Sequence, residues 1–192
     1  MFVQPGFLSA VVARYSHSHV PATKSVISFF SILSLLLAVA GCSIQLSPAY
    51  DQVTYTKLVD LNVRAETLFA SVSNGGTAAD FSAHKTTYDQ LIGGFSAARM
   101  TTATREIPNS SRQLIGTSGL RAACGADPTD CINPTPHHLD KVIVLLTAMR
   151  DTHQAGKLVG ELVSGTNGQG GFKGQYEIEM NRVLVFEAAL QR

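Results

Sequence analysis

The chain has 192 residues, of which 45% are hydrophobic and 15% are charged, and its formal net charge at pH 7 is +1. This hydrophobic content is too high for a disordered chain and suits a domain with its own core. The near balance of charges gives no electrostatic reason to expect binding to nucleic acid, nor a polybasic surface that would hold the protein on a membrane.

An apolar segment from Val26 to Ala40 follows Lys24 near the start of the chain. Its length of about 15 residues is short of the roughly 20 that a membrane-spanning helix needs. It is typical of the hydrophobic region of a signal peptide, with Lys24 as the positive flank. A plain membrane anchor or a buried helix are the alternatives.

The motif Val39-Ala40-Gly41-Cys42 places a branched aliphatic residue and two small residues before a cysteine. It resembles the lipobox of bacterial lipoproteins, whose signal peptide is cut immediately before the cysteine. The resemblance implies that residues 1–41 are removed and that Cys42 carries a lipid, which tethers the protein in the cell envelope. Because Ser43 follows rather than aspartate, the resemblance favours the outer membrane, with the domain facing the periplasm.

The segment before the apolar run is longer than a usual signal peptide requires, and we expect translation to start downstream of Met1, at a codon such as that of Val20. Removing residues 1–41 takes away two basic residues and no acidic one, which leaves about 150 residues with a formal charge of −1. We therefore expect a signal peptide over 1–41, a tether over 42–49 and one domain over 50–192.

Apolar residues recur at steps of three and four in the first half of this domain, which predicts two helices. The two stripes are Leu58, Leu61, Ala65, Leu68 and Val72, and then Phe81, His84, Tyr88, Leu91, Phe95 and Ala98. Ser47-Pro48 predicts the start of the first helix, and Thr77 with Asp80 resembles a capping box for the second. The second helix contains Gly93-Gly94, which would permit either a close helix crossing or a kink.

Two further helices are expected in the second half, over about 135–163 and 172–190. Their inward residues are Leu139, Val142, Leu146, Met149, His153 and Gly156, and then Phe172, Tyr176, Met180, Val183 and Leu190. No segment alternates with period two. The pattern therefore predicts an all-α fold, an antiparallel four-helix bundle, with one long connection over 108–135 between the second and third helices.

Two cysteines, Cys124 and Cys131, lie in that polar, turn-rich connection. In an exported domain, cysteines this close in sequence tend to pair. We expect a disulfide that pins the connection, and two reduced thiols are the alternative.

The enzyme and haem motifs His-Glu-x-x-His, Glu-x-x-His, Cys-x-x-Cys-His and Gly-x-Ser-x-Gly are all missing from the sequence. His84 and His153 each fall on an apolar stripe, near the same end of an antiparallel helix pair. Two imidazoles meeting there could ligate a metal ion or haem, although a half-buried structural histidine fits the same pattern. His137-His138 is expected to face solvent near the cysteine loop.

These observations predict a non-enzymatic, membrane-tethered envelope lipoprotein that binds a protein partner or an envelope component and carries no cofactor. A periplasmic metal- or haem-binding bundle using His84 and His153 is the alternative. An enzyme with a site built from scattered residues also stays open.

Overall fold

The computed structural model describes residues 45–117, 119, 122, 124, 127–166 and 170–191. The apolar segment, the lipobox and Cys42 lie outside these residues. The contacts divide the chain between Ser43 and Ile44, so every described residue belongs to the unit 44–192.

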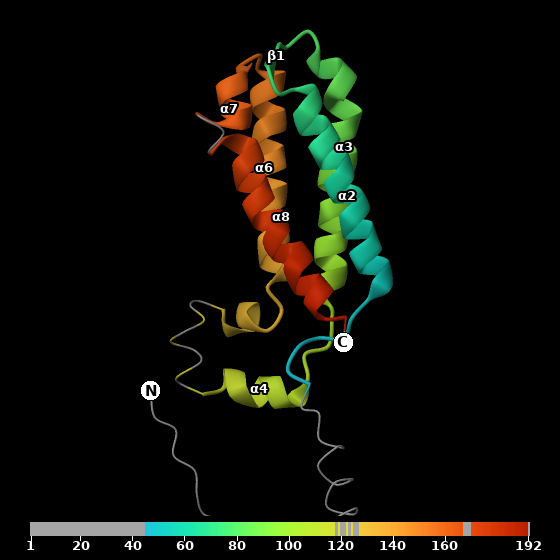
Figure 1. Cartoon of the computed structure of the whole chain (residues 1–192), viewed down its shortest axis with the longest axis vertical. Coiled ribbons are helices and arrows are strands. Elements are labelled where there is room, and N and C mark those ends of the chain that lie inside the picture. The colour runs from blue at the N-terminus through green and yellow to red at the C-terminus, as the bar shows by residue number, and fades with distance from the viewer. Residues whose placement is uncertain are drawn as a thin grey trace, which may run out of the picture. The chain divides into compact units, whose positions relative to one another are not determined.

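This unit is mostly helical, which confirms the all-α class (Figure 1). Its elements are α2 (Gln52–Ser71), β1 (Gly75–Gly76), α3 (Phe81–Ala103), α4 (Asn109–Ile115), the 3₁₀ turn η1 (Pro128–Cys131), α6 (Thr135–Gln154), β2 (Leu158–Val159), α7 (Gly160–Ser164) and α8 (Gly171–Ala189). In the described part of the chain, no helix is both long enough and apolar enough to cross a membrane.

The four long helices surround one apolar core. Helix α3 packs on α6, α6 on α8, and α2 on both α3 and α8. The predicted stripes supply this core: Leu58, Leu61, Leu68, Tyr88, Leu91, Phe95, Leu139, Val142, Leu146, Met149, Tyr176, Met180 and Val183 are all buried. Periodicity therefore identified the inward face of each helix correctly, because the residues that repeat every turn are the ones removed from water.

The predicted start of the first helix is wrong. Helix α2 begins at Gln52, and its N-cap is Asp51 rather than Ser47. The Asp51 carboxylate accepts hydrogen bonds from the backbone N–H of Val53 at 3.0 Å and from the Thr54 hydroxyl at 2.5 Å. An ionised carboxylate satisfies an exposed helix N–H and complements the helix dipole, so it prevails over the cap-then-proline pattern four residues earlier.

The side-chain contacts of the predicted capping box form, but the second helix begins later than the box predicts, at Phe81 with Asp80 as its N-cap. The backbone N–H of Thr77 donates to the Asp80 carboxylate at 2.7 Å, and the backbone N–H of Asp80 donates to the Thr77 hydroxyl at 3.4 Å. Further along α3, a Cβ added at Gly94 would lie 2.5 Å from a methyl carbon of Leu61. Gly94 therefore permits a close crossing of α2 and α3, whereas nothing lies within 4 Å of a Cβ at Gly93.

The predicted third helix is too long. Helix α6 ends at Gln154, and Gly156 adopts a φ of +66°, which falls outside helical geometry. The chain then forms β2, which pairs antiparallel with β1, so that Gly75 lies opposite Val159 and Gly76 opposite Leu158. Gly156, expected on the inward face of this helix, instead lies at a chain reversal.

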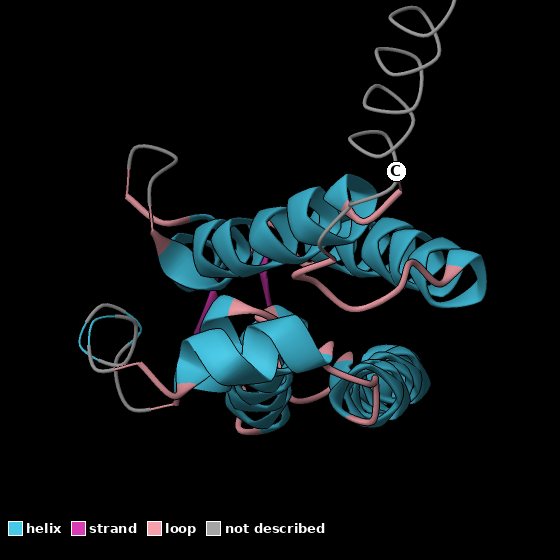
Figure 2. Ribbon diagram, turned by 90° about the horizontal axis from the view of Figure 1, so that it is seen from below, coloured by secondary structure: helices cyan, strands magenta, loops and turns pink. Residues whose placement is uncertain are grey.

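Helix α4 belongs to the long connection between α3 and α6. It runs across the ends of the long helices rather than alongside them, as Figures 1 and 2 show. It begins six residues after α3 ends, at the end of the unit where the tether enters α2.

Candidate functional site

His153, one of the two predicted ligand candidates, is fully buried near the C-terminus of α6. Its Nδ1 lies 3.2 Å from the hydroxyl of Tyr88, and its Nε2 lies 3.3 Å from a carboxylate oxygen of Asp80. The ring of Phe81 meets the imidazole edge-on, with ring centroids 5.5 Å apart. We call Asp80, Tyr88 and His153 the histidine cluster.

Every polar group of the histidine cluster has a partner when the imidazole is neutral. Burial raises the pKa of Tyr88, so its phenol stays protonated and donates to Nδ1. The hydrogen bond from the Thr77 hydroxyl, and then the one from His153, lowers the pKa of Asp80, so its carboxylate accepts from the Nε2–H. Both ring nitrogens are therefore already engaged within the protein.

The backbone beside His153 is fitted to its ring. A Cβ added at Gly76 would overlap His153 Nε2, so only glycine leaves room for the imidazole. The strand pair β1–β2 holds Gly76 in this position. The histidine thus connects α6 with β1 and with the first turn of α3, which is a structural role.

The structure brings the two predicted histidines together, since the rings of His84 and His153 have centroids 5.5 Å apart. His84 is half-buried and His153 is buried. Among the described residues, however, no group of three or more His, Cys, Asp or Glu side chains is arranged to hold a metal ion.

A groove of about 430 Å³ lies between α6 and α8. Its apolar lining includes Val144 and Ile178, which are 67% and 55% exposed, together with Leu145. Its polar lining comprises His137, Asp140, Lys141, Gln175 and Glu179. This is an exposed apolar surface between two helices, and its lining residues on α6 precede His153 of the same helix by eight residues or more.

The charges around the groove are paired with one another. Glu179 accepts from His138 Nδ1 at 2.5 Å and lies 3.7 Å from Lys141 Nζ. Asp140 forms a two-pronged contact with Arg99 of α3, with its shorter distance 3.0 Å. The prediction that His138 faces solvent is wrong, because its side chain is only 15% exposed beside Glu179.

A second buried polar group lies where α3, α6 and α8 meet at the α4 end. Arg105 Nη1 donates to Glu187 Oε1 at 2.8 Å, and the Thr135 hydroxyl donates to the same oxygen at 2.6 Å. Nearby, the Asn133 amide donates to the carbonyl of Thr102 at 2.8 Å. We call Arg105, Asn133, Thr135 and Glu187 the arginine cluster.

Sequence periodicity missed the arginine cluster. Glu187 is fully buried and the Arg105 side chain is 9% exposed, although 82 residues separate them. Glu187 follows Val183 by four residues on the inward stripe of α8, which was the available signal. An acidic residue in that position normally faces solvent, so its buried partner could not be inferred.

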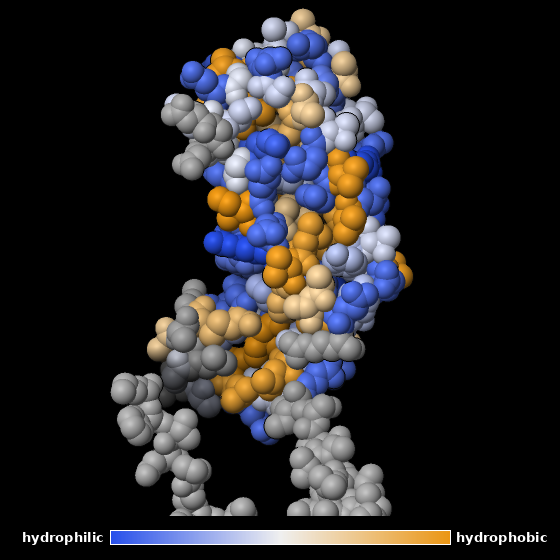
Figure 3. Space-filling model, viewed as in Figure 1, coloured by the Kyte–Doolittle hydropathy of each residue, from blue (hydrophilic) through white to orange (hydrophobic). Residues whose placement is uncertain are grey.

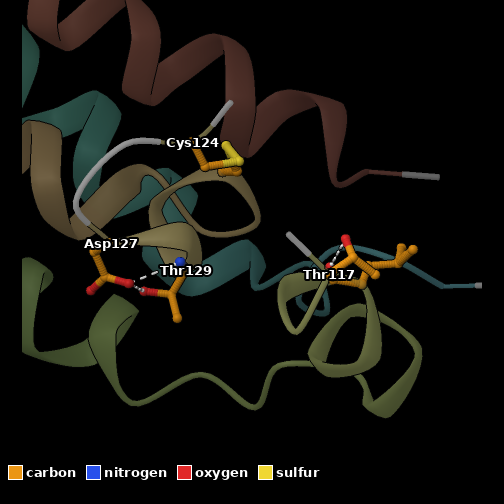
Figure 4. The surroundings of a disulfide bond; sticks show 6 residues. Thr117, Cys124, Asp127 and Thr129 are labelled. Carbon is orange, nitrogen blue, oxygen red and sulfur yellow. Dashed lines mark hydrogen bonds between the residues drawn. A yellow bond between two sulfur atoms is a disulfide. The ribbon is translucent and has the colours of Figure 1, made fainter. Parts of the chain in front are cut away.

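The cysteine loop adjoins this end of the domain. Cys124 and Cys131 have their Cα atoms 5.7 Å apart and their sulfurs 2.05 Å apart, as a disulfide requires (Figure 4). Within the loop, the Asp127 carboxylate accepts from the backbone N–H and the hydroxyl of Thr129 and so caps η1, which begins at Pro128. The oxidised pair remains a prediction for experiment.

Comparison with protein-family models, with curated proteins and with solved structures finds no match to this chain.

Proposed function

We propose that this chain is a lipid-anchored protein of the bacterial cell envelope with a non-enzymatic interaction role. Its domain is an antiparallel four-helix bundle with a disulfide-containing connection between α3 and α6. The lipobox-like motif ending at Cys42 supports the anchor, and the ring of contacts among α2, α3, α6 and α8 supports the bundle. Ser43 favours the outer membrane, facing the periplasm.

The observation that carries the interaction role is the groove between α6 and α8. Val144 and Ile178 expose apolar side chains there, while the neighbouring charges neutralise one another through the pairs with Glu179 and Asp140. A charged occupant would have to disrupt these pairs, whereas an uncharged apolar segment would bury both aliphatic side chains and leave the pairs intact. We therefore assign the groove to an apolar, uncharged segment of an envelope protein.

The anchor is tested by replacing the lipid acceptor. Cys42→Ser removes the thiol that would carry the lipid, so the protein should move from the membrane fraction to the soluble periplasmic fraction with its helical content unchanged. Mass spectrometry of the wild-type protein should show cleavage before Cys42 and added lipid. A Cys42→Ser protein that stays in the membrane would refute the lipoprotein assignment.

The groove is tested by photo-crosslinking in intact cells. A photoreactive residue replaces Ile178, which is 55% exposed, and a matched control replaces Val63 on α2, which is 58% exposed. We expect a discrete adduct only from position 178, lost in the Val144→Asp background, whose cross-linked peptide is apolar and uncharged. Equal adducts from both positions, or a charged target segment, would contradict the assignment.

A second candidate, metal or haem binding, has one observation in its favour, namely the 5.5 Å separation of the His84 and His153 rings. Engagement of both His153 nitrogens weighs against it. Native mass spectrometry of the periplasmic Cys42→Ser protein separates the two functions. The interaction role predicts the bare polypeptide mass less two hydrogens for the disulfide, and the second candidate predicts an added metal or haem mass that His153→Ala removes.

A further inference from the structure

The tether is bound to α4 before it reaches α2. The Ser110 hydroxyl donates to the carbonyl of Gln45 at 2.7 Å, and the Ser111 hydroxyl donates to the carbonyl of Leu46 at 2.5 Å. Ser111 is fully buried at this contact. The position of Gln45 is therefore fixed against α4, although it precedes that helix by 64 residues or more in the sequence.

This contact limits how far α4 can lie from the proposed lipid. Cys42 precedes Gln45 by three residues, and three residues span at most about 11 Å when fully extended. A lipid on Cys42 therefore keeps α4 close to the bilayer surface. The other end of the domain, where β1 pairs with β2, is separated from α4 by the length of α3, a helix of 23 residues or roughly 35 Å.

The surface at the α4 end has the composition that suits a lipid interface. Leu46 of the tether and Leu114 of α4 are 45% and 44% exposed, and apolar surface gathers in this region of the domain (Figure 3). Arg112 of α4 is also exposed, and α4 itself contains no acidic residue, although the exposed Glu106 precedes it by three residues. Exposed leucines next to a basic side chain are favourable at the headgroup and acyl-chain boundary.

We propose that α4 and the tether form the membrane-contacting face of this protein, with Leu46 and Leu114 inserted at the lipid interface and Arg112 at the level of the phosphates. This inference rests on the proposed lipid anchor and adds an orientation to it. The bundle then stands on its α4 end, and β1, β2 and α7 form the end directed away from the membrane.

The chain contains no tryptophan, so a single introduced tryptophan reports its own surroundings. Leu114→Trp is compared with Leu162→Trp in α7, because the two leucines are equally exposed, at 44% and 45%, at opposite ends of the domain. Each lipidated full-length variant is reconstituted into phosphatidylcholine and phosphatidylglycerol vesicles, with or without brominated acyl chains. We expect brominated lipid to quench the tryptophan fluorescence of the Leu114→Trp variant by about twofold or more and to leave that of the Leu162→Trp variant unchanged.

The mass of each protein first shows whether it carries the lipid. In lipidated protein, equal quenching at the two positions, or no quenching at position 114, would overturn the orientation and leave the anchor intact. Protein whose mass shows no lipid would overturn the proposed anchor and, with it, this inference. A Leu46→Trp variant provides an independent reading of the same face and should be quenched like Leu114→Trp. Circular dichroism of each variant verifies that the helices are retained.

Discussion

At its C-terminal end α6 contributes His153 to a buried cluster, and at its N-terminal end it contributes Thr135 to another. In the histidine cluster the groups are a phenol, an imidazole and an exposed carboxylate, and each finds a partner. In the arginine cluster two charged side chains are buried, and Arg105 Nε, Arg105 Nη2, Asn133 Oδ1 and Glu187 Oε2 have no hydrogen-bond partner among the described residues. The same helix thus ends, among the described residues, in a fully hydrogen-bonded cluster on one side and an incompletely hydrogen-bonded ion pair on the other.

The difference shows how the cost of burying a polar group depends on its charge. The imidazole of His153 has two ring nitrogens, and the fold supplies a partner for each, at 3.2 and 3.3 Å. A buried guanidinium and carboxylate lose far more hydration, and one shared contact at 2.8 Å leaves several of their atoms unmatched. We expect the removal of one partner to lower the free energy of unfolding more in the arginine cluster than in the histidine cluster.

The largest expected effect is from Arg105→Ala in the Cys42→Ser protein. Removal of the guanidinium leaves Glu187 buried without its countercharge, which should lower the free energy of unfolding by about 3–5 kcal/mol. Urea denaturation measures this loss. Replacing both partners, as in Arg105→Met with Glu187→Leu, should restore most of it, because no charge is then buried.

The matched control is the exposed pair of Lys85 and Asp89, whose shortest distance is 2.6 Å. Lys85→Ala should cost less than about 0.5 kcal/mol, because solvent screens the pair. A loss below about 1 kcal/mol for Arg105→Ala would contradict the interpretation of Arg105 and Glu187 as a buried, mutually dependent pair.

The next effect concerns the connection that carries Asn133 and Thr135 into the arginine cluster. The disulfide proposed between Cys124 and Cys131 closes a short loop, and Cys124→Ser with Cys131→Ser should destabilise the domain by about 2–3 kcal/mol. Thermal unfolding of the oxidised protein, the reduced protein and this double variant measures the effect. Identical transitions in all three would show that the bond does not stabilise the fold.

A smaller effect is expected at the histidine end from Gly76→Ala. The added Cβ would collide with the imidazole of His153, and the rearrangement should cost about 1–3 kcal/mol. In a His153→Ala background the same substitution should cost much less, which a double-mutant cycle in urea measures. Gly93→Ala is the control, since nothing lies within 4 Å of its Cβ position, and it should stabilise α3 by about 0.5–1 kcal/mol.

The smallest effect is the pH response of the histidine cluster through Asp80. The Thr77 hydrogen bond, and then the one to His153, holds the pKa of Asp80 below its ordinary value of 3.8. Its contribution to stability is therefore present above that value and is lost as the pH falls through the lowered pKa. Melting temperatures recorded from about pH 6 to about pH 3 should fall less steeply for Asp80→Asn than for the parent. Equal slopes would show that this carboxylate does not contribute.

Helix faces were predictable from the sequence because burial repeats with the helical turn. The stripe through Leu58, Leu61 and Leu68 is buried as expected, and the predicted contacts between Thr77 and Asp80 form in the turn just before α3. The β1–β2 pair was not predictable, because each strand has two residues and two of the four are glycines. Such a pair has no alternating pattern to detect.

The candidate site was predictable only in part. The proximity of His84 and His153 followed from their stripes, but the partners that occupy His153 depend on how α6, α3 and β1 pack. The groove beside Val144 and Ile178 had no sequence signal, because isolated aliphatic residues on a helix surface are common. Arg105, which donates a hydrogen bond to the buried Glu187, lies 82 residues before it, a separation that no local sequence pattern spans.

The two serine contacts of the tether have a mechanical consequence. With the proposed lipid on Cys42, a pull on it would reach the hydrogen bonds of Ser110 and Ser111 before it reached the first turn of α2, so part of the load would pass to α4 instead of the core. Rupture of these two bonds would allow residues 45–51 to extend, to a full length of about 20–25 Å. The tether would then act as a reserve of length, which would let the bundle rise from the bilayer under tension without any of its long helices unfolding.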